Sequence, residues 1–220
     1  MTQLTQRSLT AFVNRDGHQV LVPDLATDLG QASADGLTWT FHLRDGLKFS
    51  DGSPLKASDV AASLNAARSS EKSVWKDNYK AIKSVEATDD KTVKIVLSQP
   101  YAPLLSVLAM FSGGVLPADL VKASEAKDFD NANAWKTKGS GAYSVDGWKK
   151  GDPLILKRNP NYWKGKPDVD EVRIEYIPDD NTRVLKLQGG ETDVIDFVPF
   201  SQIDTLNASP GTKAQTFDIQ

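Results

Sequence analysis

The sequence of 220 residues predicts an α/β fold with a mixed sheet, and three observations carry this prediction. Residues 37–43 alternate strictly between apolar and polar side chains, as a half-buried strand does. Residues 82–87 and 92–98 are two further extended runs joined by a short polar turn, which is typical of a hairpin. Beyond residue 169 the pattern is strand, helix and strand, which indicates a right-handed crossover between parallel strands.

Helices are predicted from their end signals. Ser58 has the side chain of an N-cap, and Asp59 puts an anion in the first turn, where the helix dipole favours it. That helix is expected to reach about Arg68. Residues 103–111 predict a short apolar helix, and Pro117 suits the first position of another that ends near residue 123.

The second half of the chain has longer alternating runs. Strands are predicted over residues 143–148, 154–158 and 169–177. Asp179 or Asp180 is expected to cap a helix that ends at Gly189-Gly190. After these come a predicted strand (193–197), a helix (201–207) and a final strand (213–218). The change of character predicts an insertion: residues 1–37 and 139–220 form a larger α/β subdomain, and residues 38–138 form a smaller α+β subdomain inserted in it.

Composition excludes several classes of protein. The formal net charge is -3, and basic residues alternate with acidic ones, so a nucleic-acid partner is not expected. The sequence has no cysteine, which removes disulfides, thiolate metal sites and cysteine nucleophiles without fixing the compartment. The longest apolar run, residues 104–111, is too short to cross a bilayer. The first seven residues are polar and carry no signal peptide.

No residue pattern indicates catalysis or a cofactor. The two histidines are His18 and His42, and His42 lies on the polar side of an alternating strand, where a solvated side chain is expected rather than a general base. The glycines of residues 138–141 precede a strand instead of a helix, unlike a phosphate-binding loop. Acidic pairs such as Asp89-Asp90 have turn neighbours and no calcium-loop spacing. Neither an enzyme nor a metal protein is predicted.

Aromatic residues near glycines are the candidates for ligand binding. Trp75 and Tyr79 are four residues apart in a polar stretch, and Phe111 ends an apolar helix just before Ser112-Gly113-Gly114. Two interpretations stay open. The rings pack the core, or they form the wall of a cleft in which backbone groups near the glycines hold the polar ends of a ligand.

Two long segments carry a resemblance to a known family. Residues 36–60 read GLTWTFHLRDGLKFSDGSPLKASDV, and residues 139–148 read GSGAYSVDGW, continued by LILKRNPNYW at 154–163 and GETDV at 190–194. Both resemble the extracellular solute-binding proteins of the oligopeptide, dipeptide and nickel ABC importers, bacterial family 5. The resemblance begins near Leu9 and covers nearly the whole chain. The motifs are architectural and do not contact the ligand in this interpretation.

The resemblance implies a lobe of a bilobal protein of the type II periplasmic-binding-protein fold. Such proteins close on a solute outside the cytoplasmic membrane and deliver it to the transmembrane permease of an ABC importer. A periplasmic or extracellular monomer is therefore expected, and a lipid anchor is left open. The family's opening strand and second lobe are expected to lie outside these 220 residues.

The expected function is capture of peptides or a similar small solute, without a cofactor and without chemistry on the ligand. Nickel chelates, oligosaccharides or heme-like molecules are alternative cargoes, and a sensory receptor ectodomain is an alternative role; a hydrolase would need a catalytic group outside this chain. Three places in this lobe are expected to contribute to the site. They are Trp75 with Tyr79, the turn of Phe111, Ser112, Gly113 and Gly114, and the turn of Ser140 and Gly141.

Overall fold

A computed structural model describes residues 2–71, 73–125, 138–149 and 151–216. The chain forms two compact units, Met1–Arg173 and Ile174–Gln220. Each unit is described by itself. The mixture of helices and strands confirms the predicted α/β class.

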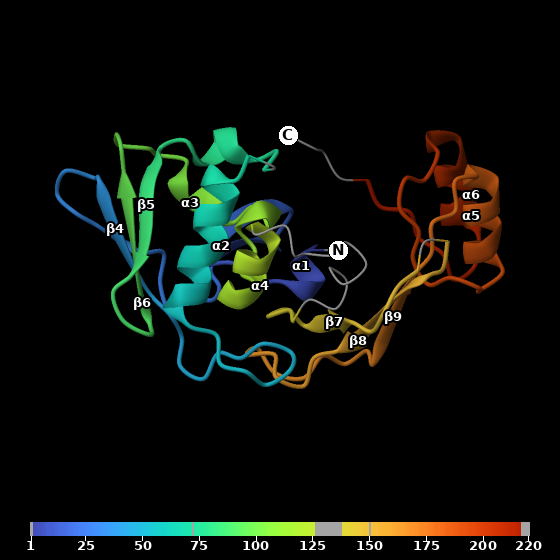
Figure 1. Cartoon of the computed structure of the whole chain (residues 1–220). Helices are drawn as coiled ribbons and strands as arrows, with labels where there is room; N and C mark the ends of the chain where they lie inside the picture. Colours follow the sequence, from blue (N-terminus) through green and yellow to red (C-terminus); the bar gives the residue numbers. More distant parts are fainter. Residues whose placement is uncertain (1, 72, 126–137, 150, 217–220) are drawn as a thin grey trace. The chain divides into compact units, whose positions relative to one another are not determined.

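The larger unit is organised around a four-stranded sheet. Its strand order is β3 (Gln31–Ala32), β4 (Thr38–His42), β6 (Thr92–Leu97) and β5 (Ile82–Ala87), and every neighbouring pair is antiparallel. Helix α2 (Ala57–Ser69) covers one face of this sheet, as Figure 1 shows. The strand and the hairpin predicted from alternation are confirmed.

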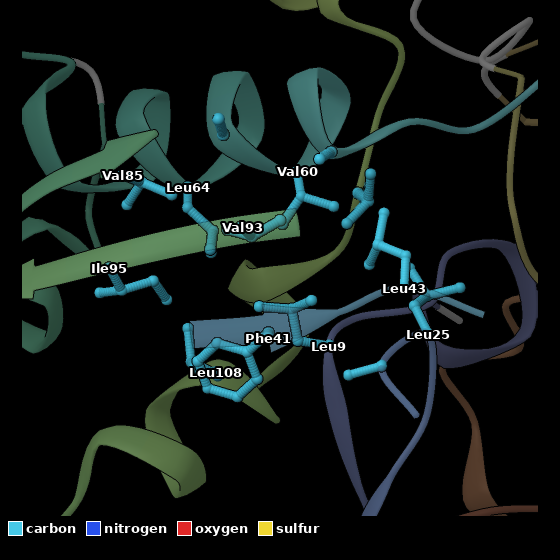
Figure 2. Close-up of a cluster of buried hydrophobic side chains, with 14 of the residues drawn as sticks. Leu9, Leu25, Phe41, Leu43, Val60, Leu64, Val85, Val93, Ile95 and Leu108 are labelled. Atoms are coloured by element: carbon cyan, nitrogen blue, oxygen red, sulfur yellow. The ribbon is translucent and has the colours of Figure 1, made fainter. Parts of the chain in front are cut away.

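The core lies between α2 and the sheet. Val60 and Leu64 point from the helix toward Val93 of β6, and Phe41 of β4 lies beneath them (Figure 2). These side chains are at most 1% exposed. Burying a side chain of this size contributes roughly 1.5–3 kcal/mol, so this layer holds the unit together. The alternation of β6 puts Ile95 in the same layer.

The start of α2 differs from the prediction. Ser58 is not the cap: the helix begins at Ala57, and Lys56 takes the N-cap position. The capping is done by Asp59, whose Oδ2 accepts the backbone N–H of Lys56 at 2.8 Å and whose Oδ1 accepts that of Ala118 at 2.8 Å. One buried carboxylate therefore satisfies donors at the starts of two helices. The contact with Lys56 is local, whereas the contact with Ala118 is tertiary and leaves no local pattern.

The segment after β6 contains the short helices that were predicted. Helix α3 (Leu104–Leu108) is shorter than the predicted 103–111, because a 3-10 turn at Phe111–Gly113 follows it. Helix α4 (Ala118–Glu125) begins directly after Pro117 and packs beside α2 (Figure 1).

A hairpin that the sequence analysis missed lies near the beginning of the chain. Strands β1 (Thr10–Arg15) and β2 (His18–Pro23) are antiparallel. Asp16 and Gly17 have φ angles of 52° and 83°, the left-handed values of a type I′ turn. The Asp-Gly pair between two extended runs is the signal that could have identified it.

The remaining sheet of the larger unit has the order β7 (Tyr143–Val145), β8 (Leu154–Arg158) and β9 (Glu171–Ile174). The prediction of β8 is confirmed in full. Strands β7 and β9 are shorter than predicted. Tyr143 and Leu156 form a small separate core there.

The smaller unit contains helices α5 (Asp180–Gln188) and α6 (Ile203–Ala208). The side chain of Asp179 caps α5 by accepting the N–H of Thr182, as predicted. Residues 193–197 do not form the predicted strand. Phe197 has a φ of 57°, which extended backbone cannot have, and its side chain is 91% exposed. The predicted parallel crossover is therefore not formed.

Two further predictions concern segments that the structure describes only in part. Residues 213–216 are irregular, which corrects that part of the predicted last strand, and residues 217 and 218 lie outside the described residues. The predicted insertion of residues 38–138 into a larger subdomain stays a prediction. In the part of the chain that the structure describes, no helix combines the length and the apolar character needed to cross a membrane.

The double role of Asp59 is testable. We expect Asp59→Ala to lower the free energy of unfolding by about 2 kcal/mol, because two helix N-termini lose a buried hydrogen-bond acceptor. Asp119 lies in the first turn of α4 with its side chain exposed, and Asp119→Ala is the matched control. Urea unfolding measures both. Equal losses in the two variants would contradict the assignment.

Candidate functional site

The backbone of residues 5–9 is the scaffold of the candidate site, and three distant parts of the chain hydrogen-bond to it. Gly141 donates to the carbonyl of Thr5 at 3.0 Å. Val115 donates to the carbonyl of Arg7 at 2.9 Å. Asp24 and Ala26 both donate to the carbonyl of Leu9. Residues 5–9, which begin at the end of helix α1 (Thr2–Thr5), are called the N-terminal strip below, and they fix the positions of all three partners.

A pocket lies along the N-terminal strip. Its lining comes from the strip, from β1, from Asp24 and from the segment between α3 and α4: Gln6, Arg7, Ser8, Ala11, Phe12, Asp24, Ala109, Met110, Phe111 and Gly114. The cavity volume is about 30 Å³, far below the roughly 300–1,000 Å³ of a complete small-molecule site. This wall is apolar and aromatic with a few polar groups, which is the chemistry of a site for a small organic solute.

Of the predicted aromatic residues, Phe111 lines this pocket and Trp75 packs against it. The rings of Trp75 and Phe111 meet edge to face, with centroids 4.6 Å apart at an angle of 85°. Phe111 is 48% exposed and lines the pocket, so its ring offers a surface to a ligand. The prediction that Trp75 and Phe111 contact a ligand stays a prediction.

Tyr79 lies deeper, in the core. Its side chain is fully buried, and its hydroxyl lies 2.9 Å from the hydroxyl of Ser112. Burial raises the pKa of the Tyr79 hydroxyl, and the hydrogen bond with Ser112 opposes that effect. The phenol is therefore neutral at any physiological pH and holds the turn that carries Phe111.

The two glycines of that turn permit close approach of backbone segments. A Cβ atom on Gly113 would lie 2.5 Å from the carbonyl oxygen of Leu108. A Cβ on Gly114 would lie 2.6 Å from Oε1 of Gln6. The absence of a Cβ on Gly114 therefore leaves room for the side chain of Gln6 at the pocket wall. Both glycines have a packing role whether or not they contact a ligand.

Ser140 and Gly141 lie on another side of the N-terminal strip. The hydroxyl of Ser140 accepts the backbone N–H of Arg7 at 3.0 Å, and Asn159 donates its side-chain amide to the carbonyl of Gly141 at 2.8 Å. Both residues are buried and neither lines the pocket. The structure thus brings six of the eight predicted residues together at the aromatic end and places these two behind the strip.

Asp24 is the centre of a charged cluster next to the pocket. Its Oδ2 accepts from Nε of Arg7 at 2.6 Å, and its Oδ1 lies 3.6 Å from Nζ of Lys164. The Nε of Arg44 donates to its backbone carbonyl at 2.6 Å. The guanidinium of Arg44 and the ammonium of Lys164 both lie over the ring of Trp163. Arg7 and Lys164 therefore face the carboxylate of Asp24, and Arg44 faces its backbone carbonyl.

A second ion pair holds the turn behind the strip. Nζ of Lys138 lies 2.7 Å from Oδ2 of Asp51, and next to it the backbone N–H of Ser50 donates to the carbonyl of Gly139 at 2.8 Å. The hydrogen bond from Lys138, followed by those from Ser53, lowers the pKa of Asp51 to about 2.

No group of three or more histidine or acidic side chains among the described residues is arranged to hold a metal ion.

The comparisons with known proteins agree with this architecture. The sequence pattern of the bacterial extracellular solute-binding proteins, family 5 (middle part), matches residues 20–219. The chain belongs to this family.

Individual relatives show how much of a family 5 protein the chain spans. It is 35% identical over 183 residues to the probable D,D-dipeptide-binding periplasmic protein DdpA of Escherichia coli K12, covering 83% of this chain and 35% of that protein. It is 34% identical over 177 residues to the glutathione-binding protein GsiB of the same strain, covering 79% of this chain and 33% of that protein. The chain therefore spans about a third of the length of these curated relatives.

A solved structure confirms the fold. The binding protein AgaA of A. tumefaciens R10, in complex with agropinic acid, superimposes with a TM-score of 0.84 at 34% identity, over 95% of this chain and 41% of that one. The predicted resemblance to family 5 and to the type II periplasmic-binding-protein fold is confirmed.

Sequence reasoning missed the residues that the strip and its partners bring to the pocket, namely Gln6, Arg7, Phe12, Asp24 and Met110. Residues 1–8 have no periodic pattern, and the ligand-facing strand of the family was expected to lie outside the chain. The motif-bearing segments at 36–60 and 139–163 do not line the pocket.

The lowered pKa of Asp51 predicts a pH dependence of stability. Because the folded-state pKa is below the ordinary 3.8, the carboxylate stabilises the fold fully above about pH 4, and this stabilisation is lost as the pH falls toward 2. We expect Asp51→Asn to have a lower thermal midpoint than the parent at pH 6, with the difference shrinking between pH 4 and pH 2.

Asp168, which is exposed, provides the matched control. Asp168→Asn is expected to change the midpoint little at pH 6. A constant difference between the parent and Asp51→Asn across the pH range would show that the ion pair with Lys138 does not cause the effect.

Proposed function

We propose that this chain is one lobe of the solute-binding component of an ABC importer, and that it captures peptides or a similar small solute outside the cytoplasmic membrane. The observation that carries the proposal is the pocket along the N-terminal strip, in a chain that belongs to family 5. The partner is the transmembrane permease of the importer, and the working form is a monomer in the periplasm or at the cell surface.

The composition of the pocket supports binding of a small polar organic molecule. Phe12, Met110 and Phe111 supply apolar contact area, whereas Gln6 and Arg7 supply hydrogen-bond donors. The names of relatives are consistent with this chemistry: DdpA is named a probable D,D-dipeptide-binding protein, GsiB a glutathione-binding protein, and AgaA was solved with agropinic acid. All three are small solutes with several polar groups.

The size of the pocket supports a site that is shared with a second lobe. A volume of about 30 Å³ cannot enclose a dipeptide, so this wall covers one side of the ligand only. Closure of a second lobe over the wall would exclude water and complete the contacts. Ligand affinity then arises from both walls together.

The same wall supports binding without chemistry. His18 and His42 do not line the pocket, and its charged residues, Arg7 and Asp24, are paired with each other at 2.6 Å. A general acid or base needs a titratable group positioned at a reacting atom. The family consists of solute-binding proteins, and we propose that this one returns its ligand unchanged.

A binding panel tests the proposal on the complete protein. The probes are D-alanyl-D-alanine, glutathione, trialanine and agropinic acid, measured by calorimetry. We expect at least one peptide probe to bind with micromolar or tighter affinity and to be recovered intact. We also expect the 220 residues alone to bind each probe more weakly than millimolar, because half of the contacts are missing. Micromolar binding by the 220 residues, or turnover of a peptide, would contradict the proposal.

The aromatic end of the pocket provides a second test. We expect Phe111→Ala to weaken binding of the best probe by roughly tenfold, since the exposed ring loses its contact with the ligand. Val74 is 84% exposed and does not line the pocket, so Val74→Ala is the matched control and should leave the affinity unchanged. Unchanged affinity in Phe111→Ala would remove Phe111 from the site.

A further inference from the structure

We infer that the side-chain amide of Gln6 binds a peptide group of the ligand, and that Gly114 positions this amide. The inference rests on the proposed function and names the part of the ligand that this wall recognises. Two observations carry it. The polar group of Gln6 has no partner of its own in the described chain, and the missing side chain of Gly114 leaves the space that this group occupies.

The other polar side chains of the pocket are already engaged within the protein. Arg7 and Asp24 bind each other at 2.6 Å. The hydroxyl of Ser8 donates to the carbonyl of Thr10 at 2.8 Å. Within the ranges that the structure describes, the side-chain amide of Gln6 forms no hydrogen bond. Gln6 is half-buried, so its amide is partly shielded from water and still accessible to a ligand.

The backbone at Gly114 sets where this amide lies. A Cβ atom on Gly114 would lie 2.6 Å from Oε1 and 3.2 Å from Cβ of Gln6, so the Gln6 side chain runs along the glycine. The next residues of the two segments are hydrogen-bonded, because the N–H of Val115 donates to the carbonyl of Arg7 at 2.9 Å. The amide is therefore held beside Gly114 at the pocket wall, and a side chain that is already confined loses less conformational entropy when it binds.

The chemistry of a carboxamide matches that of a peptide group. Its oxygen accepts an N–H and its NH₂ group donates to a carbonyl, and every peptide bond not formed by proline carries both of these groups. Met110 and Phe111 line the same pocket and offer apolar contact to the parts of the ligand beside that bond. The wall therefore fits a neutral peptide group, with Gln6 as the residue that hydrogen-bonds to it.

The first test replaces the peptide bond of the ligand, in the complete protein. The probes are D-alanyl-D-alanine and trialanine, each with the analogues in which an ester replaces one peptide bond, and calorimetry measures their affinities. The ester lacks the N–H, so at one of these bonds we expect the parent to bind it roughly 3- to 10-fold more weakly than the amide. Gln6→Met keeps the length of the side chain without its amide, and we expect it to reduce this ratio to about 1.

A second test moves the amide without removing it. Gly114 has a φ of -59°, which alanine also adopts, and the atom that its Cβ would meet most closely is the flexible end of Gln6. We therefore expect Gly114→Ala to fold, to displace the Gln6 amide and to reduce the amide-to-ester ratio to about 1. Adding Gly114→Ala to Gln6→Met should cost little further affinity, since both changes remove the same contact.

A matched control separates ligand binding from a general effect of the substitution. Gln31 is an exposed glutamine of β3 in the same unit, and it does not line the pocket. Gln31→Met should leave the amide-to-ester ratio as in the parent. Thermal midpoints of all variants monitor folding, since the ratio is read only from folded protein.

The outcomes are distinguishable. A parent that binds every ester as tightly as its amide, or a Gln6→Met variant that weakens both while keeping the parental ratio, would overturn the inference and leave the proposed function standing. A folded Gly114→Ala variant that keeps the parental ratio would overturn the positioning role of Gly114. If neither peptide binds to the parent, the peptide function fails and the inference fails with it.

Discussion

The N-terminal strip is the constraint on which the rest of the larger unit depends. Its carbonyl groups at Thr5, Arg7 and Leu9 accept hydrogen bonds from three segments of the chain, at Gly141, at Val115 and at Asp24 and Ala26. Backbone donors and acceptors that are buried must be paired, so each of these segments is fixed once the strip is in place. Residues 139 and 141 are glycine where a Cβ would collide with the backbone of residues 4 and 5, and this lets the segment that carries them come this close.

This arrangement separates the parts of the chain that build the fold from the part that meets a ligand. The two long motifs that identify family 5 form strands, turns and the core beneath α2, and they do not line the pocket. The pocket wall uses the strip, β1 and the turn after α3 instead. In this chain, different side chains build the fold and line the pocket.

The charged cluster at Asp24 adds paired charges to the pocket wall. An isolated buried carboxylate would cost several kcal/mol, and Arg7 and Lys164 compensate that cost. Because Asp24 is held through its backbone by Leu9 and Arg44, the position of the carboxylate is set by the fold, and the position of the Arg7 guanidinium follows from it.

The sequence by itself determined the elements that have a local cause. The alternation of apolar and polar residues predicted β4, β5 and β6 with their buried faces. Side-chain caps and prolines predicted α4 and α5, and two long motifs indicated the family. Trp75 and Phe111 were named from the sequence as ligand-binding candidates; their rings meet in the structure, and their contact with a ligand stays a prediction. Only the tertiary structure decided the rest: that Asp59 rather than Ser58 caps α2, that residues 193–197 are not a strand, and that Arg7 and Asp24 meet at the pocket. The contact of Asp59 with Ala118 and that of Arg7 with Asp24 join residues that are not neighbours in the sequence, and a hydrogen bond from Val115 or Gly141 to an aperiodic strip leaves no periodic trace in either segment.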